Sequence, residues 1–176
     1  VHRGAETSFD VSADLDELAR TEVVVVSAGA KAILDLPKTL EVLETLGVPV
    51  VGWKTDDFPA FWSRRSGLPA PLRIDDAPAL ARFMAARRAL GLGGGLLVAN
   101  PVPPADEIDA DEMAGHIAAA QAEAERAGIR AKAVTPFLLA RILESTGGRS
   151  LATNRALVLN NAAVAAEIAV ALAAEA

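Results

Sequence analysis

The chain has 176 residues, the length of one ordinary domain, and 52% of them are hydrophobic, which is enough to bury a sizeable core. The net charge of −6, with no basic block to offset it, argues against nucleic acid and anionic membranes as partners. The absence of cysteine excludes disulfides and thiolate zinc sites and fits a cytoplasmic location. No signal-peptide pattern opens the chain, and no apolar run approaches the roughly 20 residues needed to cross a bilayer.

The predicted elements alternate between strands and helices. Four apolar runs are predicted strands, at residues 23–27, 48–53, 72–74 and 95–99. Six periodic segments are predicted helices, at residues 14–20, 31–46, 77–90, 109–127, 136–145 and 151–174. This order predicts a three-layer α/β/α fold with a mainly parallel central sheet and a C-terminal third that is almost entirely helical.

Several helix starts carry residues typical of caps. Asp14, with Glu17 three residues later, has the spacing of a capping box. Thr135 directly before Pro136 predicts a helix start, and Ser150 is a candidate cap for the last helix. We therefore expect these residues to mark helix boundaries.

A lysine stands where the first predicted strand is followed by a helix, in the sequence Ser27-Ala-Gly-Ala-Lys31. A helix that begins near Lys31 places partial positive charge beside the ammonium, which favours the neutral amine. A neutral amine can attack a carbonyl and form a Schiff base. The alternatives are that Lys31 binds a substrate phosphate or extends into solvent.

The segment before the first long helix, residues 6–14, is rich in oxygen ligands. Asp10 and Asp14 are candidate ligands for Mg²⁺ or Mn²⁺, which prefer carboxylate and water oxygens. The spacing alone favours the simpler interpretation, in which Asp14 caps a helix and Asp10 occupies a turn. Asp10 is harder to explain structurally, because it caps no predicted helix.

Three further groups have both a functional and a structural interpretation. Asn154 and Asn161 share a face of the last predicted helix and either bind ligand hydroxyls or cap neighbouring helices. His2 and Arg3 either contact a phosphate or are solvated. Residues 53–61 follow a strand, where open α/β sheets bind ligands, or they form a rigid loop held by two phenylalanines.

Taken together, these segments resemble the pseudouridine-5′-phosphate glycosidases, also called the indigoidine synthase A-like family. The matching motifs run along the whole chain, at residues 2–15, 27–37, 55–61, 99–103, 134–139, 146–148 and 160–162. Many motifs in one order are more specific than any single one of them.

The resemblance implies an enzyme that reversibly splits the carbon–carbon glycosidic bond of pseudouridine 5′-phosphate, giving uracil and ribose 5-phosphate. It also implies a Mn²⁺-dependent homotrimer. The sequence begins with Val1 and enters without a helix cap, so residues 1–176 are expected to be the C-terminal portion of one glycosidase domain. The family's glutamate proton donor and a second substrate-binding lysine are expected upstream of this chain.

The family's functional residues can be carried over where the motifs match. Lys31 falls on the nucleophilic lysine and Asp10 on the metal ligand. The residues expected to bind substrate are Ser12, Ala13, Asp14, Asn154 and His2.

The implied chemistry agrees with the residues. A C-glycoside has no leaving oxygen to protonate, so the pair of carboxylates used on O-glycosides is ill suited to it. An amine that attacks C1′ opens the sugar and leads to an iminium ion that acts as an electron sink. Two rival functions use the same residues: a Schiff-base aldolase or isomerase acting on a sugar phosphate, and a non-catalytic module that binds a sugar phosphate.

Overall fold

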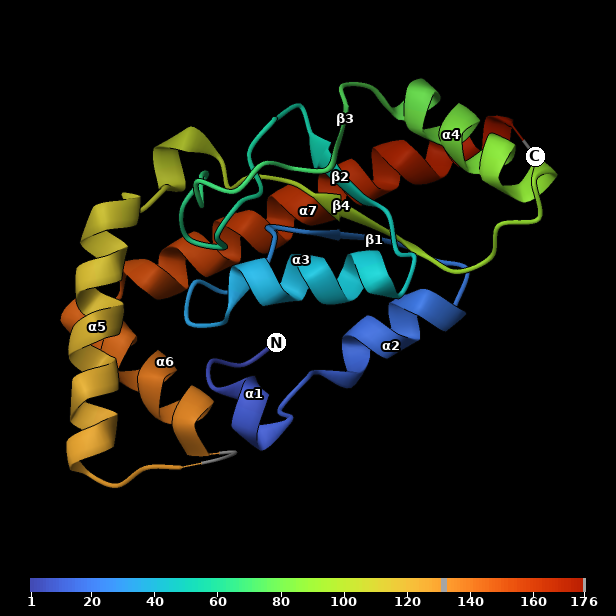
Figure 1. Ribbon diagram of the computed structural model, residues 1–176. Helices are drawn as coiled ribbons and strands as arrows, with labels where there is room; N and C mark the ends of the chain where they lie inside the picture. The colour runs from blue at the N-terminus through green and yellow to red at the C-terminus, as the bar shows by residue number, and fades with distance from the viewer. Residues whose placement is uncertain (131–132, 176) are drawn as a thin grey trace.

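The computed structural model describes residues 1–130 and 133–175 as a four-stranded sheet with helices on both faces (Figure 1). The strands are β1 (Val24–Ser27), β2 (Val50–Trp53), β3 (Leu72–Ile74) and β4 (Leu96–Ala99). They run parallel in the spatial order β1-β4-β2-β3, so the last strand to be made lies inside the sheet. The predicted α/β/α fold with a parallel sheet is confirmed.

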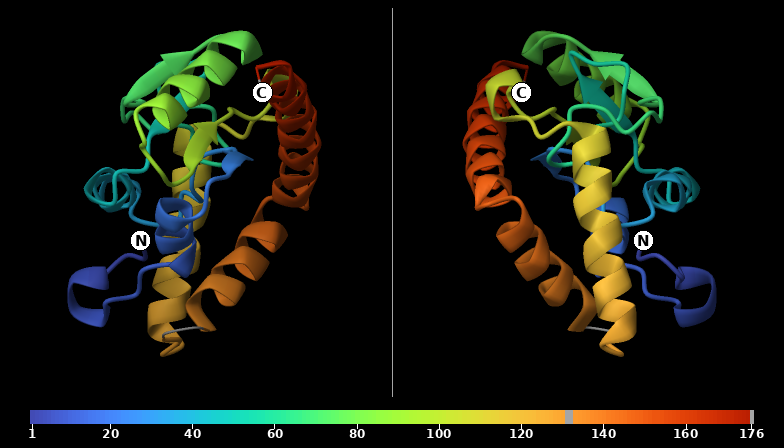
Figure 2. Two further views of the ribbon diagram at one scale, coloured as in Figure 1. Left: turned by 90° about the vertical axis from the view of Figure 1, so that its right-hand side faces the viewer. Right: turned by 90° about the vertical axis from the view of Figure 1, so that its left-hand side faces the viewer.

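The helical elements are α1 (Ala5–Ser8), α2 (Ala13–Arg20), α3 (Leu36–Thr45), α4 (Ala77–Ala89), η1 (Pro104–Asp106), α5 (Ala110–Arg126), α6 (Val134–Ser145) and α7 (Arg149–Ala174). Helix α7 runs along the sheet, whereas α5 and α6 extend away from it and pack against each other (Figure 2). The C-terminal third is helical, as predicted.

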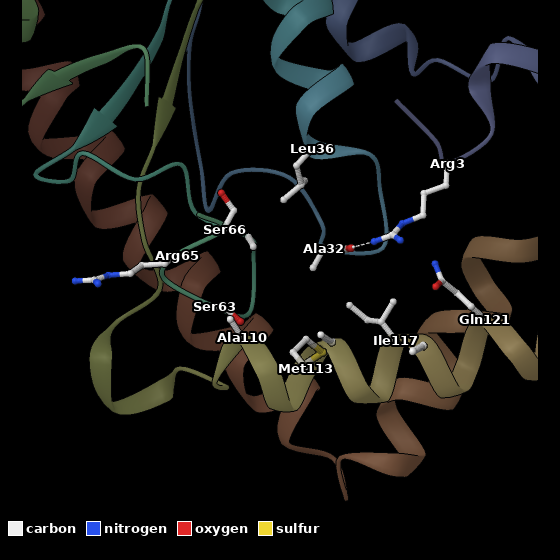
Figure 3. A pocket seen from close by; sticks show the side chains of 13 residues that line it. Arg3, Ala32, Leu36, Ser63, Arg65, Ser66, Ala110, Met113, Ile117 and Gln121 are labelled. Atoms are coloured by element: carbon white, nitrogen blue, oxygen red, sulfur yellow. Dashed lines mark hydrogen bonds between the residues drawn. The ribbon is translucent and has the colours of Figure 1, made fainter. Parts of the chain in front are cut away.

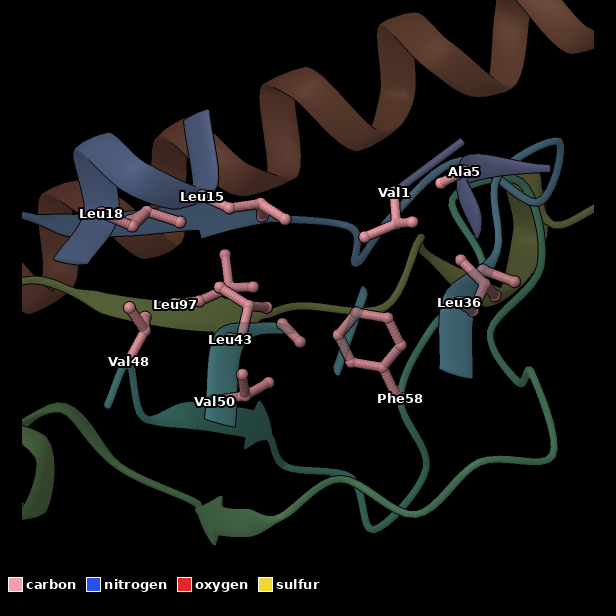
Figure 4. Packing of buried hydrophobic residues seen from close by; sticks show 12 residues of the cluster. Val1, Ala5, Leu15, Leu18, Leu36, Leu43, Val48, Val50, Phe58 and Leu97 are labelled. Carbon is pink, nitrogen blue, oxygen red and sulfur yellow. The ribbon is translucent and has the colours of Figure 1, made fainter. Parts of the chain in front are cut away.

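The core lies on both faces of the sheet because successive strand residues point to opposite sides. On one face, Val50 and Leu97 pack against Leu43 of α3 (Figure 4). On the other face, Val51 and Val98 pack against α4 and α7. All five of these side chains are at least nine-tenths buried. The sheet is thus fixed from both sides, and its strand ends are fixed with it.

The predicted caps are wrong in detail. Ser12 caps α2, since its Oγ accepts a hydrogen bond from the Asp14 backbone N–H at 3.3 Å. Thr135 and Ser150 lie inside α6 and α7, and Gly148 stands at the start of α7. Ser12 has extended backbone angles, as a cap residue requires, and the helix begins at the next residue, Ala13.

Helix α3 begins five residues later than predicted, at Leu36 instead of Lys31. The Asp35 carboxylate caps it by accepting a hydrogen bond from the Lys38 backbone N–H at 3.1 Å. The field of a helix falls off within its first turn. The helix-charge argument for a neutral Lys31 therefore does not hold, because Lys31 lies in the loop before the helix.

Helix α7 corrects the expectation that no segment is apolar enough to cross a membrane. It has 26 residues, and the mean hydropathy of its most apolar window is 1.8. Leu157, Val164 and Ile168 of this helix are buried against the rest of the fold. Only 17% of that window is buried, and a single helix judged by length and composition alone is weak evidence for a membrane span.

Candidate active site

A cavity of about 520 Å³ lies on the α3 side of the sheet, beside β1 and α2. Four of the predicted site residues line it: Lys31, His2, Ser12 and Asp14. They come from two separate segments: residues 1–14, called the N-terminal strip below, and the loop after β1. Much of the remaining wall is apolar, which is typical of a small-molecule site with a few convergent polar groups.

The loop that carries Lys31 is held by a close main-chain contact. Gly29 has a φ of +75°, and a Cβ placed there would lie 1.9 Å from the carbonyl oxygen of Pro59. The Phe61 N–H donates a hydrogen bond to the Ala28 carbonyl at 2.9 Å. Only glycine allows this approach, so the small-residue turn seen in the sequence serves to dock one loop on another.

The Lys31 side chain is half-buried in the cavity wall. Among residues 1–130 and 133–175, no carboxylate forms an ion pair with its ammonium group. A half-buried amine without such a partner is available to a ligand. Lys31 is therefore the best-placed candidate nucleophile of the cavity.

The N-terminal strip is ordered by short-range contacts. The His2 N–H donates to the Asp10 carbonyl at 3.0 Å, and His2 Nδ1 lies 3.8 Å from Asp10 Oδ2. Ser12 Oγ donates to Asp14 Oδ2 at 3.0 Å. Asp10 is exposed and joins the cavity only through His2, while Ala13 is exposed at the start of α2. The strip thus presents His2, Ser12 and Asp14 to the cavity, with Asp10 at its margin.

Two contacts fasten this strip to the lysine loop. The Lys38 ammonium bridges Glu6 at 2.8 Å and Asp35 at 2.9 Å. Its hydrogen bonds hold the pKa of both carboxyl groups below their usual values, and they raise the pKa of Lys38 itself. The Arg3 guanidinium donates to the Ala32 carbonyl at 3.1 Å, beside a second cavity of about 280 Å³ (Figure 3). The position of the strip therefore depends on residues that follow Lys31 directly in the chain, from Ala32 to Lys38.

The predicted metal ligand has few partners. Within the described part of the chain, no group of three or more histidine, cysteine, aspartate or glutamate side chains is placed to hold a metal ion. An exposed carboxylate such as Asp10 suits a hard divalent ion that keeps most of its water. Asp10 is the single predicted ligand, and the described residues form no closed cage around it, so its role as a metal ligand stays a prediction.

The asparagines of α7 divide into two roles. Asn161 Oδ1 accepts a hydrogen bond from the buried Asn100 side chain at 3.0 Å, and Asn160 donates to the Pro101 carbonyl at 3.2 Å. These two hold the loop after β4. Asn154 is half-buried and is not among the residues that line the cavity, so its substrate-binding role stays a prediction.

The cavity wall also includes residues that were not predicted as site residues, among them Ser27, Phe58, Phe61 and Thr135. Both phenylalanines of the segment 53–61 line the cavity, and both are also packed into the fold, so the two interpretations of this segment stay open. Thr135 was interpreted as a helix cap, and nothing in its local sequence indicates that the start of α6 faces this cavity.

The fold and the site together describe an α/β/α protein with a parallel sheet and a lysine-bearing cavity beside its first strand. The family model for indigoidine synthase A like protein matches residues 1–171. A pseudouridine-5′-phosphate glycosidase of Methylobacterium nodulans is 70% identical over 172 residues, which are 98% of this chain and 51% of that protein. The corresponding protein of Solibacter usitatus is 64% identical over 96% of this chain and 56% of its own length. This chain belongs to the indigoidine synthase A-like family, and it spans about half the length of these curated relatives.

Two solved structures resemble the fold. The prealnumycin C-glycosynthase, in complex with ribulose 5-phosphate, has a TM-score of 0.93 and 38% identity, over 99% of this chain and 57% of that one. An indigoidine synthase A-like protein from Thermotoga maritima has a TM-score of 0.85 and 39% identity, over 100% of this chain and 56% of that one. The family resemblance inferred from the sequence motifs is thereby confirmed.

Proposed function

We propose that this chain carries the nucleophilic half of an enzyme that reversibly cleaves pseudouridine 5′-phosphate into uracil and ribose 5-phosphate. The observation that carries the proposal is the half-buried Lys31 amine, which lines one cavity with His2, Ser12 and Asp14. The names of the curated relatives support this substrate, and the C-glycosynthase with its bound sugar phosphate supports the broader class of C-glycosides.

The chemistry follows from the amine. Lys31 Nζ attacks C1′, the C1′–O4′ bond breaks, and O4′ takes up a proton as the nitrogen, positively charged after the attack, gives one up and the sugar opens. The bond between C1′ and uracil C5 then breaks, its electron pair leaves with uracil, and C5 takes up a proton. The nitrogen lone pair forms the iminium bond to C1′ as uracil departs. Water hydrolyses that bond, which releases ribose 5-phosphate and restores the amine.

The residues of the strip are assigned by chemistry. His2 and Ser12 would donate hydrogen bonds to the phosphate or hydroxyls, and Asp14 would accept one from a hydroxyl. Asp10 would hold a hydrated Mn²⁺ ion. When bound, the ion would act as a template and Lewis acid. Ala13 would contribute backbone contacts, and Asn154 would hold hydroxyls of the opened sugar. The homotrimer and the cytoplasmic location are further expectations of the same proposal.

Trapping of the imine tests the proposal. Incubation of the chain with ribose 5-phosphate and borohydride is expected to give one mass adduct, which peptide mapping places at Lys31. Lys31→Ala and Lys31→Arg are expected to give none, because arginine keeps its charge and cannot form the imine. Lys54→Arg, at an exposed lysine outside the cavity, is the matched control and should retain the adduct. An adduct that persists in Lys31→Ala would refute the role of Lys31.

The rival functions give different products. A Schiff-base aldolase or isomerase would also trap at Lys31, but it would convert the sugar without releasing uracil from pseudouridine 5′-phosphate. A sugar-phosphate-binding module would raise the melting temperature with ribose 5-phosphate and give no adduct. The ultraviolet absorbance of free uracil and the mass of the protein separate all three.

A further inference from the structure

We infer that Phe61 provides the surface against which the pyrimidine ring of the substrate packs, an inference that rests on the function proposed above. Phe61 lines the cavity of about 520 Å³ together with Lys31. The reaction requires a planar base to be held while its bond to the sugar breaks. The cavity wall must therefore offer a flat apolar surface close to the amine.

The backbone of Phe61 is fixed in a conformation that a bulky residue rarely adopts. Its φ is +66°, in the left-handed region that favours glycine. The loop keeps this conformation because the Phe61 N–H bonds to the Ala28 carbonyl and Gly29 pairs with Ala60 in an antiparallel bridge. Ala28 stands three residues before Lys31. Backbone strain of this kind is concentrated at functional sites, and here it fixes the phenylalanine relative to the lysine.

The Phe61 side chain packs against two hydrophobic clusters, one that contains Trp62 and one that contains Leu157. It makes an edge-to-face contact with Trp62, with centroids 5.1 Å apart and ring planes at 87°. Trp62 is 3% exposed, and its indole N–H donates to the Ser150 carbonyl at 3.1 Å. Leu157 of α7 also packs against Phe61. The ring remains only half-buried, so part of its surface is left open at the cavity.

The second phenylalanine of the cavity wall cannot serve the same purpose. Phe58 is 0% exposed and is enclosed in the core beneath α3. The apolar wall near β1 and α2 is otherwise aliphatic, with Leu15, Val25 and Leu97 among its residues. An aromatic face interacts with a planar base more strongly than branched aliphatic groups do. Phe61 is therefore the side chain that can select a pyrimidine.

Titration of uracil tests the inference. Uracil is added to the intact chain in the presence of ribose 5-phosphate, and binding is followed by two-dimensional NMR of the backbone amides and the phenylalanine rings. In the wild-type chain, we expect saturable shifts at Phe61 and Ala28. In Phe61→Leu, we expect the dissociation constant of uracil to rise about tenfold, because one base–aromatic contact is lost. The affinity for ribose 5-phosphate, measured separately, is expected to change less than about twofold.

Three variants make the result specific. Phe61→Tyr keeps the ring and is expected to keep the uracil affinity. Phe137→Leu removes a half-buried ring from α6 outside this cavity and is the matched control. Phe61→Gly relieves the left-handed backbone, so it provides a folded variant without the ring if Phe61→Leu does not fold.

The outcomes separate the inference from the proposed function. Equal uracil affinity in wild type and in the folded variants without the ring would overturn the inference, as would the absence of uracil binding at millimolar concentration. If the Lys31 adduct forms in either case, the proposed function stands without Phe61. If no adduct forms at Lys31, the proposed function itself fails.

Discussion

The loops that follow β1 and β4 lie at the same edge of the sheet but use their polar residues differently. After β4, the Asn100 side chain is buried and donates to Asn161, and Asn160 holds the Pro101 carbonyl. After β1, Lys31 faces a cavity, and no carboxylate of the described residues pairs with it. The loop after β4 uses side-chain hydrogen bonds for stability. The loop after β1 is fixed by its main chain, which leaves the Lys31 side chain available to a ligand.

The largest expected effect tests whether the main chain alone fixes the β1 loop. Gly29→Ala places a Cβ 1.9 Å from the Pro59 carbonyl and forces alanine to a φ of +75°. We expect a loss of unfolding free energy of about 3 kcal/mol or more, measured by urea unfolding. Gly47→Ala is the matched control, with a φ of +71° and no atom within 4 Å, and should cost only about 1 kcal/mol. Equal losses in the two variants would mean that the contact with Pro59 is unimportant.

The second largest loss of stability is expected when the hydrogen bond that holds the β4 loop is removed. Asn161→Ala leaves the Asn100 side chain without its partner at 4% exposure. An unsatisfied buried amide should lower the unfolding free energy by about 1–3 kcal/mol. Asn154→Ala, on the same helix, is the control and should have little effect on the urea midpoint. A stable Asn161→Ala protein would show that water replaces the lost hydrogen bond.

A smaller effect concerns the bridge between the N-terminal strip and α3. The pKa of Glu6 and that of Asp35 are held below their ordinary values of 4.5 and 3.8 by Lys38. A lowered pKa favours the folded state when the carboxyl is ionised, so this contribution is present above those values and is lost as the pH falls through the lowered ones.

Lys38→Met is therefore expected to have a lower urea midpoint than wild type at neutral pH. The difference between the two midpoints should narrow as the pH falls to about 3. The change is expected to be small, because these ion pairs are exposed to solvent. Lys54→Met removes an exposed lysine that forms no ion pair within the described residues and should show no such trend. If the difference in urea midpoint between wild type and Lys38→Met did not depend on pH, the ion pairs of Lys38 with Glu6 and Asp35 would make no contribution to stability.

The smallest effect on stability is expected at Lys31, the proposed nucleophile. Lys31→Met removes an ammonium group that has no carboxylate partner in the described part of the chain. We expect a change in unfolding free energy within about 0.5 kcal/mol, together with complete loss of the borohydride adduct. A large loss of stability would instead give Lys31 a structural role like that of Asn161.

Local patterns were enough to predict most of the fold. The valine and leucine runs of β1, β2 and β4 placed these strands to within one or two residues, because buried parallel strands are continuously apolar. The start of α3 was missed because Ala32, Ile33 and Leu34 continue the apolar period through a turn. The boundary is marked by the Asp35 cap and by Pro37 in the first turn, a pair of signals that the apolar period outweighed in the prediction.

The site was predictable only in part. Lys31, His2, Ser12 and Asp14 were identified by motif, and the structure places them around one cavity. The role inferred for Phe61 could not be predicted, because its left-handed backbone depends on a hydrogen bond to Ala28, which is remote in the sequence. Sheet order could not be predicted for the same reason, since strand neighbours are chosen by long-range packing.

The interior position of β4 has a consequence for biosynthesis. A ribosome releases β1 and β2 long before residues 96–99 emerge, yet both strands pair with β4 and not with each other. Before that segment arrives, β1 has no strand partner and β2 can pair only with β3, and contacts so distant in sequence form slowly. We expect nascent chains that end before residue 96 to be recognised by chaperones as unfolded, because the cavity that holds Lys31 is completed only after β4 joins the sheet.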